Sequence, residues 1–298
     1  MPTLVELLRT ENRPPSARLK HEVIRFIQGN QTVYSMPLDI IKNLAETADC
    51  IRRNSPDRLQ NLYEKVHGFC MEGIEKIRHD SNGHSPVELE DFEFSFRAYA
   101  GGAAKAEYKL TNDISWAEEW FKNYKKSAEL AENIAGRNAD SVNSANGNLV
   151  KRAAHAYGFA AEAAKVLHEK FKIENLMGKI KYGEDEVPAE IVWAVQWYEY
   201  SIKSANLAVK LGGESRNLAN YGYRDGARAA RVLLKFYREP EYAQAVIDCN
   251  RKHLQFGGPH RDRDRTIRRI LQESQRMDMF IKTYGKPGGF YNRIFITK

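Results

Sequence analysis

The most distinctive charged stretch of the sequence is HRDRDRTIRRIL, which covers residues 260–271 near the C-terminal end. On a helix, one side of the region 267–284 carries a mostly apolar set, which consists of Ile267, Ile270, Leu271, Ser274, Met277, Ile281 and Tyr284. Five arginines fall on the opposite side: Arg261, Arg265, Arg268, Arg269 and Arg276. They extend over about 23 Å at a rise of ~1.5 Å per residue, and their guanidinium groups could follow a phosphate backbone through paired hydrogen bonds. The alternative is a solvated final helix whose arginines pair with acids of a neighbouring helix.

Positive charge is concentrated in the same part of the chain. The full sequence has a formal net charge of +7. Residues 249–298 contain 12 Lys or Arg and 4 Asp or Glu, a net charge of +8, whereas the first 248 residues have a net charge of −1. This uneven distribution of charge favours an anionic ligand for the C-terminal part. It does not indicate which fold the chain adopts. The five arginines are therefore the predicted binding site for an anion or a nucleic acid.

Aromatic residues in the two preceding predicted helices are candidates for stacking on nucleic-acid bases beside this basic surface. At helical spacing, such residues more often belong to the apolar core, which is the interpretation we favour. The six residues are Tyr221, Tyr223, Phe236, Tyr237, Tyr242 and Phe256.

Patterns for catalysis or metal binding are weak in this sequence. Glu64 and His67 have the Glu-x-x-His spacing of carboxylate-bridged di-iron bundles, but that site needs a second such motif, which the sequence lacks. No nucleophile elbow, P-loop or glycine-rich dinucleotide motif is present. We therefore predict no catalytic residues, no metal and no cofactor, and interpret the chain as a non-enzymatic protein.

The elements that position these residues are predicted to be helices, because apolar residues recur at helical spacing along almost the whole chain. Prolines near first turns and glycines after last turns indicate the helix ends. Only the segment 290–297 (FYNRIFIT) has a strand-like pattern, which we interpret as an extended tail. The predicted helices cover residues 3–11, 16–28, 37–53, 56–79, 87–110, 114–135, 148–172, 188–211, 217–237, 240–255 and 262–284.

Size and composition favour a globular protein. The 298 residues are 42% hydrophobic and 29% charged, as is typical of folded chains. No run of apolar residues is long enough for a transmembrane helix, and the first residues have no signal-peptide pattern. Three widely spaced cysteines, Cys50, Cys70 and Cys249, argue against a disulfide framework or a zinc site and favour the reducing cytoplasm.

A sequence repeat relates the central helices. WAEEWFKNYKKSAELA at residues 116–131 returns at 193–208 as WAVQWYEYSIKSANLA, with eight of sixteen positions identical. A helix rich in small residues precedes each copy, and a third version of that helix begins at Tyr221. Small residues three and four apart leave a shallow groove that the bulky face of the next helix can fill. The repeat therefore predicts antiparallel helical hairpins, each covering the apolar side of the one before.

These hairpins resemble tetratricopeptide repeats over roughly residues 90–256. The positions that match the small and aromatic pattern are Gly101, Gly102, Ala117, Tyr124 and Ala128 in the first repeat and Gly158, Ala194 and Ala205 in the second. The repeat length departs from the family's 34 residues, the closing proline is missing, and paired tryptophans open the second helix. The resemblance implies a right-handed α-solenoid whose concave surface binds peptides or protein partners.

We divide the predicted all-α chain into four segments. Residues 1–85 form capping helices or a small bundle, 86–258 the hairpin repeats, 259–284 a basic capping helix and 285–298 an extended tail. The favoured function is a cytoplasmic, non-enzymatic scaffold that binds a protein or peptide partner and offers a basic C-terminal surface to an anionic ligand. The alternative is an RNA- or DNA-binding helical repeat that uses the arginine face. No membrane partner is predicted, and homo-oligomerisation is left open.

Overall fold

The chain is divided into two compact units, residues 1–149 and 150–298. Within the described residues, both units are built from helices, and a single two-stranded hairpin belongs to the second. No described helix combines the length and the hydropathy that crossing a membrane requires. The structure is a computed structural model, which describes residues 3–10, 15–29, 33, 35–54, 62–79, 83–137, 144–173, 179–182, 185–212, 215–256 and 263–284.

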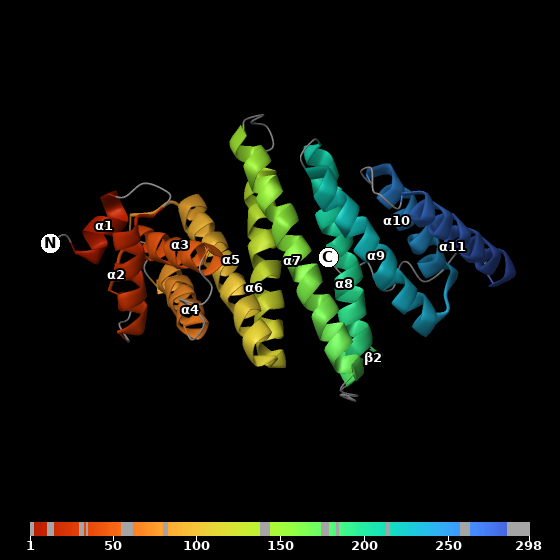
Figure 1. Ribbon diagram of the computed structural model, residues 1–298, viewed down its shortest axis with the longest axis horizontal. Coiled ribbons are helices and arrows are strands. Elements are labelled where there is room, and N and C mark those ends of the chain that lie inside the picture. Colours follow the sequence, from red (N-terminus) through yellow and green to blue (C-terminus); the bar gives the residue numbers. More distant parts are fainter. Residues whose placement is uncertain are drawn as a thin grey trace. The chain divides into compact units, whose positions relative to one another are not determined.

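The helices of the first unit pack mainly on their neighbours in sequence (Figure 1). Its complete helices are α1 (Leu4–Thr10), α2 (Ala17–Gln28), α3 (Leu38–Asn54), α4 (Tyr63–His79), α5 (Pro86–Thr111) and α6 (Ile114–Arg137). Helix α5 contacts α3, α4 and α6. One apolar core extends from Leu7 in α1 to Ala103 in α5, so the helices on both sides of residue 85 share it.

The second unit continues the same organisation. Helix α7 (Ser144–Ile173) begins in the first unit, and α8 (Ala189–Leu211), α9 (Arg216–Tyr237), α10 (Pro240–Phe256) and α11 (Arg263–Tyr284) follow in the second. Each of α9, α10 and α11 contacts the helix before it (Figure 1). Between α7 and α8, the Ser204 hydroxyl donates to the backbone oxygen of Ala154 at 2.7 Å, and Tyr157 stacks on Tyr200.

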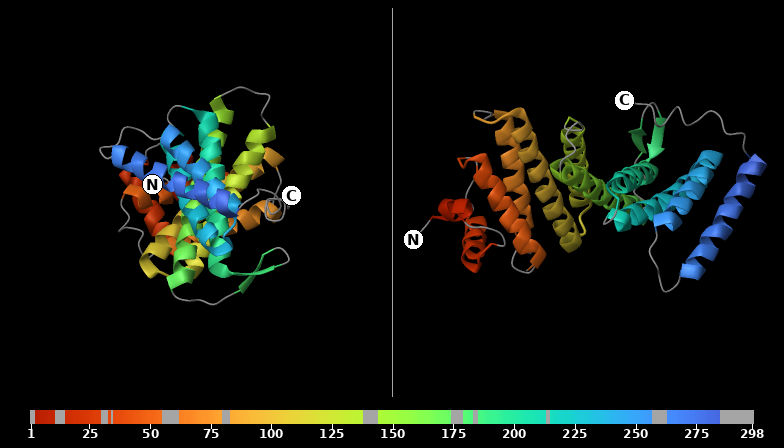
Figure 2. Two further views of the ribbon diagram at one scale, coloured as in Figure 1. Left: turned by 90° about the vertical axis from the view of Figure 1, so that its right-hand side faces the viewer. Right: turned by 90° about the horizontal axis from the view of Figure 1, so that it is seen from above.

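A short β-hairpin separates α7 from α8. Strand β1 (Lys179–Tyr182) pairs antiparallel with β2 (Asp185–Pro188), so that Lys179 lies opposite Pro188 and Tyr182 opposite Asp185. The hairpin leads directly into α8, contacts it, and projects from the helices of its unit (Figure 2). We predicted no strand here, because four residues are too few for an alternating apolar pattern to become visible.

The predicted all-α fold is confirmed, and the sequential packing of antiparallel helices is that of the α-solenoid class. Predicted and observed helix ends agree within two residues except at two starts. Helix α4 begins at Tyr63 rather than at 56, with residues 55–61 outside the described part, and α7 begins earlier than predicted, at Ser144. The strand-like segment 290–297 lies outside the described residues. The tetratricopeptide assignment and its right-handed twist stay predictions.

Small residues allow neighbouring helices to approach closely. An added Cβ at Gly101 in α5 would lie 2.7 Å from the Tyr124 ring in α6. At Gly222 in α9, it would lie 2.7 Å from the backbone oxygen of Ser201 in α8. Such distances are shorter than van der Waals contact, so only glycine fits at these crossings. The contact between α5 and α6 is the one that the repeat predicts within a hairpin, whereas Gly222 brings α9 close to α8, the last helix of the preceding hairpin.

Candidate anion-binding site

Helix α11 packs on its neighbours through one apolar side, as predicted. Ile270 is 4% exposed, and Met277 packs against Ala230 of α9 and Ala245 and Val246 of α10. Leu271, which we placed on the same side, is instead 52% exposed. It lies one residue, or 100° of helix rotation, beyond Ile270, and this rotation carries it to the edge of the contact.

The structure describes the side chains of three of the five predicted arginines. Arg268, Arg269 and Arg276 are exposed and form no ion pair with any described residue. Arg265 lies within α11, but its side chain is outside the described part, and Arg261 lies outside the described residues altogether. Arg268, Arg269 and Arg276 therefore do not pair with a described acid of a neighbouring helix, while their exposure is what the alternative of a solvated final helix also predicts.

Two of these arginines contribute to a pocket of about 340 Å³ between α9 and α11. It is lined by Arg228 and Arg231 from α9 and by Arg269, Gln272, Glu273 and Arg276 from α11. We refer to these six residues as the arginine pocket. Arg268 does not line it, so the structure separates one predicted residue from the two that share the cavity.

An ion pair between helices holds the pocket together. The Arg231 Nη2 donates to Glu273 Oε2 at 2.6 Å, and its Nε donates to Glu273 Oε1. The same Oε2 accepts from the Asn250 amide of α10 at 3.0 Å. Arg231 and Glu273 have side chains that are 35% and 20% exposed, so the pair is partly shielded from solvent. A bidentate pair of this kind fixes both side chains and links three helices.

Positive charge exceeds negative charge around the pocket. Four arginines line it, and two carboxylates oppose them: Glu273 pairs with Arg231, and Asp225 accepts from Arg228 Nη1 at 3.1 Å. The Arg228–Asp225 pair lies within one helix and is about 30–44% exposed, and such pairs contribute at most about 1 kcal/mol. Arg269 and Arg276 are therefore the uncompensated cations, with Arg228 only weakly engaged.

The α9 arginines were missed by the sequence analysis, which assigned the basic character to the last fifty residues. A signal for them does exist, since Arg224, Arg228, Arg231 and Lys235 recur at helical spacing along one side of α9. Their proximity to α11 is not visible in the sequence, because Arg231 and Glu273 are 42 residues apart.

The candidate base-stacking aromatics belong mostly to the core, as we favoured. Tyr223 and Tyr242 are 2% and 6% exposed. Phe256 stacks on Tyr223, and Tyr237 stacks on Tyr242. Tyr221 and Phe236 are the exposed members of the six, and the guanidinium of Arg224 lies over the Tyr221 ring.

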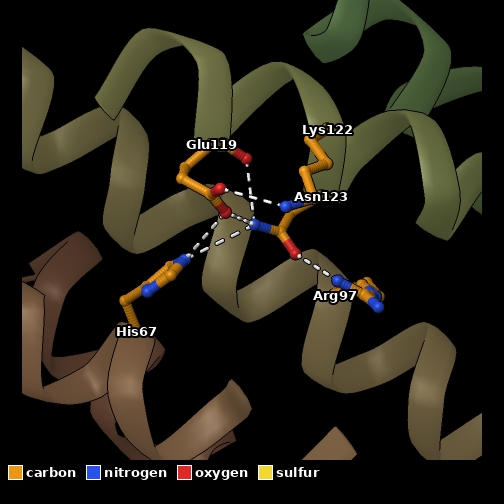
Figure 3. A network of polar contacts seen from close by, with 5 residues as sticks. All are labelled: His67, Arg97, Glu119, Lys122 and Asn123. Carbon is orange, nitrogen blue, oxygen red and sulfur yellow. Dashed lines mark hydrogen bonds and ion pairs between the residues drawn. The ribbon is translucent and has the colours of Figure 1, made fainter. Parts of the chain in front are cut away.

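A second polar cluster, in the first unit, contains the histidine of the Glu-x-x-His motif (Figure 3). The Asn123 amide nitrogen lies 3.4 Å from His67 Nε2, and its oxygen accepts from Arg97 at 3.1 Å. Glu119 Oε2 lies 3.5 Å from His67 Nε2. Burial lowers the pKa of His67, although Glu119 acts in the opposite direction. Among the described residues, no group of three or more His, Cys, Asp or Glu side chains could hold a metal ion. We interpret the cluster as an interior hydrogen-bond network.

The cysteine thiols are all free, and two of them are buried. Burial raises the pKa of Cys249 to about 12, and it raises the pKa of Cys70 as well. A thiol with a raised pKa carries little thiolate at neutral pH and is a poor nucleophile.

Fold and site together define an all-α helical-repeat protein of the α-solenoid class with an arginine-lined pocket in its second unit. No protein-family model matches the chain, and no curated protein is significantly similar in sequence. Solved structures give only weak similarity. A computationally designed self-assembling cyclic homo-oligomer is 12% identical, with a TM-score of 0.39 over 87% of this chain and 92% of that one.

Two further structures are similar to the same degree. The designed helical repeat protein DHR64 is 14% identical, with a TM-score of 0.33 over 89% of this chain and 98% of its own. The S. pombe nuclear import adaptor Nro1 is 9% identical, with a TM-score of 0.29 over 90% of each chain. These scores are too low to assign a shared architecture or function, so the assignment to the α-solenoid class rests on the helices themselves.

Proposed function

We propose that this chain is a non-enzymatic, cytoplasmic helical-repeat scaffold whose arginine pocket binds an acidic segment of a protein or peptide partner. The main support for this proposal is that Arg269 and Arg276 line one cavity and form no ion pair with any described residue. Guanidinium groups bind carboxylates and phosphates through parallel hydrogen bonds and stay charged at any physiological pH. Two such groups held in one cavity repel each other until an anion binds between them.

Exposed apolar side chains on α11 favour a protein as the partner. Leu271 is 52% exposed and Met279 is 61% exposed, on the same helix as the uncompensated arginines. Arginine and methionine are enriched at protein interfaces, whereas surfaces that bind nucleic acid are more polar and more positively charged. The mixture on α11 therefore supports a protein partner over the nucleic-acid alternative.

The nucleic-acid alternative draws its support from α9, where Arg224, Arg228, Arg231 and Lys235 extend the basic surface. Asp225 and Glu273 offset part of this charge. A protein that follows a phosphate backbone needs many uncompensated cations, because each phosphate contact releases a counterion. The local pairing on α9 reduces the number available and makes a discrete anionic group the better ligand.

Fluorescence anisotropy with two labelled probes tests the proposal. The probes are a short peptide of alternating Glu and Gly and a single-stranded RNA of equal charge. We expect the peptide to bind, and the double substitution Arg269→Glu and Arg276→Glu to weaken its binding at least about tenfold, or about 1.4 kcal/mol. The matched control is Lys172→Glu with Lys210→Glu, two exposed lysines of the same unit outside the pocket.

Equal losses in the pocket variant and the control would show that the attraction is non-specific, and the proposed site would be wrong. Tighter binding of the RNA, with the same dependence on Arg269 and Arg276, would instead establish the nucleic-acid alternative.

A further inference from the structure

The balance of charge in the arginine pocket indicates which anion suits it. The carboxylate of Glu273 is occupied by Arg231 and Asn250, so this pair is close to neutral. Arg228 shares Asp225 with Arg224. Arg269 and Arg276 form no ion pair with any described residue, and the one carboxylate that lies between them, Glu273, is paired with Arg231. The pocket therefore has about two uncompensated positive charges, and a single carboxylate would leave one of them unopposed.

The spacing on α11 lets both uncompensated arginines act on one group. Arg269 and Arg276 are seven residues apart, which is about two turns and ~10.5 Å along the axis, and they lie on nearly the same side. Gln272 and Glu273 lie between them, and all four line the same cavity. The long arginine side chains can converge over this midpoint from both ends, while Arg228 approaches from α9.

The guanidinium of Arg228 can also bind the ligand, at a small cost in free energy. The Arg228–Asp225 pair is partly exposed and lies within one helix, so exchanging it for a ligand costs about 1 kcal/mol at most. Arg231 is different, because its bidentate bond to Glu273 would have to break. Arg228, Arg269 and Arg276 can thus bind three oxygens, and the Gln272 amide is an additional neutral donor.

We infer that the arginine pocket receives a phosphate monoester, as carried by a phosphorylated serine or threonine of the partner. This inference rests on the proposed function and specifies the chemistry of its ligand. A phosphate monoester has a charge of about −1.5 to −2 at neutral pH and three strong acceptor oxygens. It matches the uncompensated charge and the three available guanidiniums, whereas a carboxylate or a phosphodiester has a single negative charge.

The pH dependence of binding separates these ligands. The second pKa of a phosphate monoester is about 6, so lowering the pH from about 7.5 to about 5.5 removes most of its second charge. A glutamate side chain, with a pKa of about 4.3, stays ionised over this range, and so do the arginines. Binding of the monoester therefore weakens on acidification, and binding of a carboxylate does not.

The experiment is an NMR titration of the full chain, observed at the arginine Nε–Hε groups. The probes are the blocked amino acids N-acetyl-phosphoserine amide and N-acetyl-glutamate amide, and the dinucleotide ApA as a phosphodiester. We expect phosphoserine to bind about tenfold more tightly than glutamate at pH 7.5, and to lose most of that advantage at pH 5.5. Arg269→Gln with Arg276→Gln should abolish the preference, and Lys210→Gln should preserve it.

The substitution Glu273→Gln gives a second, independent test of the inference, because it removes the one acidic group that lines the pocket and releases Arg231. Phosphoserine should then bind more tightly than to the natural protein, provided that the unliganded Nε–Hε signals of Arg269 and Arg276 match those of the natural protein and so show an intact pocket. Weaker binding to a variant with an intact pocket would contradict the inference.

The other outcomes are also decisive. If phosphoserine and glutamate bind equally at both pH values, the phosphate inference fails while the acidic-partner function stands. If ApA binds more tightly than phosphoserine, the ligand is nucleic acid. If no probe shifts the arginine signals, both the inference and the proposed function are wrong.

Discussion

His67 illustrates how a residue that is suggestive in the sequence can have an interior role. Its Nε2 faces the amide nitrogen of Asn123 and a carboxylate oxygen of Glu119, and its ring lies edge-on to Trp116. Lys122 and Arg97 are the cations nearby. Burial dominates and lowers the pKa of His67, so the neutral ring is the form that the folded protein prefers.

This preference predicts a loss of stability on acidification. The unfolded chain binds a proton at His67 near the ordinary pKa of about 6.5, whereas the folded chain binds it only at lower pH. Stability from this group is therefore complete above about pH 6.5 and declines as the pH falls toward the folded-state pKa. Urea unfolding at about pH 7.5 and about pH 5.5 should show a smaller loss of stability for His67→Gln than for the natural protein.

The matched control for this prediction is His21→Gln, at a histidine whose side chain is 77% exposed. It should lose as much stability as the natural protein between the two pH values. An equal loss of unfolding free energy in all three proteins would show that burial of His67 does not cause this pH dependence.

At the scale of elements, the close contact between α8 and α9 depends on Gly222. A methyl group there would lie 2.7 Å from the Ser201 backbone oxygen and 2.8 Å from the Ala205 Cβ. Gly222→Ala gains up to about 1 kcal/mol from helix propensity, but overpacking against backbone costs roughly 1–3 kcal/mol. We expect net destabilisation in a denaturant melt.

Gly68→Ala in α4 isolates the propensity gain, because an added Cβ there meets nothing within 4 Å. This variant should be stabilised by about 0.5–1 kcal/mol. Stabilisation of both variants would show that α8 and α9 are not in tight contact at Gly222.

The elements themselves were largely predictable from sequence. Apolar periodicity and the glycine and proline signals are local, so α8, α9 and α10 were placed to within one residue at each end. The hairpin of β1 and β2 was missed because each strand has only four residues. Two of the six residues of the arginine pocket, Arg269 and Arg276, were predictable for the same reason. The arginine face of α11 follows from its own spacing, whereas the apposition of Arg228 and Arg231 depends on contacts between helices far apart in sequence.

At the scale of the whole molecule, the structure changes the interpretation of the charge. The sequence places a net charge of +8 in residues 249–298, and the basic surface around the pocket also includes α9, which precedes that segment. One acid of the C-terminal segment, Glu273, is used to hold an α9 arginine. The proposed binding therefore depends on the two uncompensated arginines of α11 and on the α9 arginines that the fold places beside them, and not on the count along the chain.

A charge-swap titration tests whether Arg269 and Arg276 form an anion-binding site. Labelled peptides of alternating Glu and Gly, and of alternating Lys and Gly, are titrated by anisotropy against the natural protein and against the Arg269→Glu, Arg276→Glu variant. We predict that the natural protein prefers the glutamate peptide and that the folded variant reverses this preference, because the charge of the pocket has changed sign. An unchanged preference for the glutamate peptide in the variant would contradict the assignment of the arginine pocket as the anion-binding site.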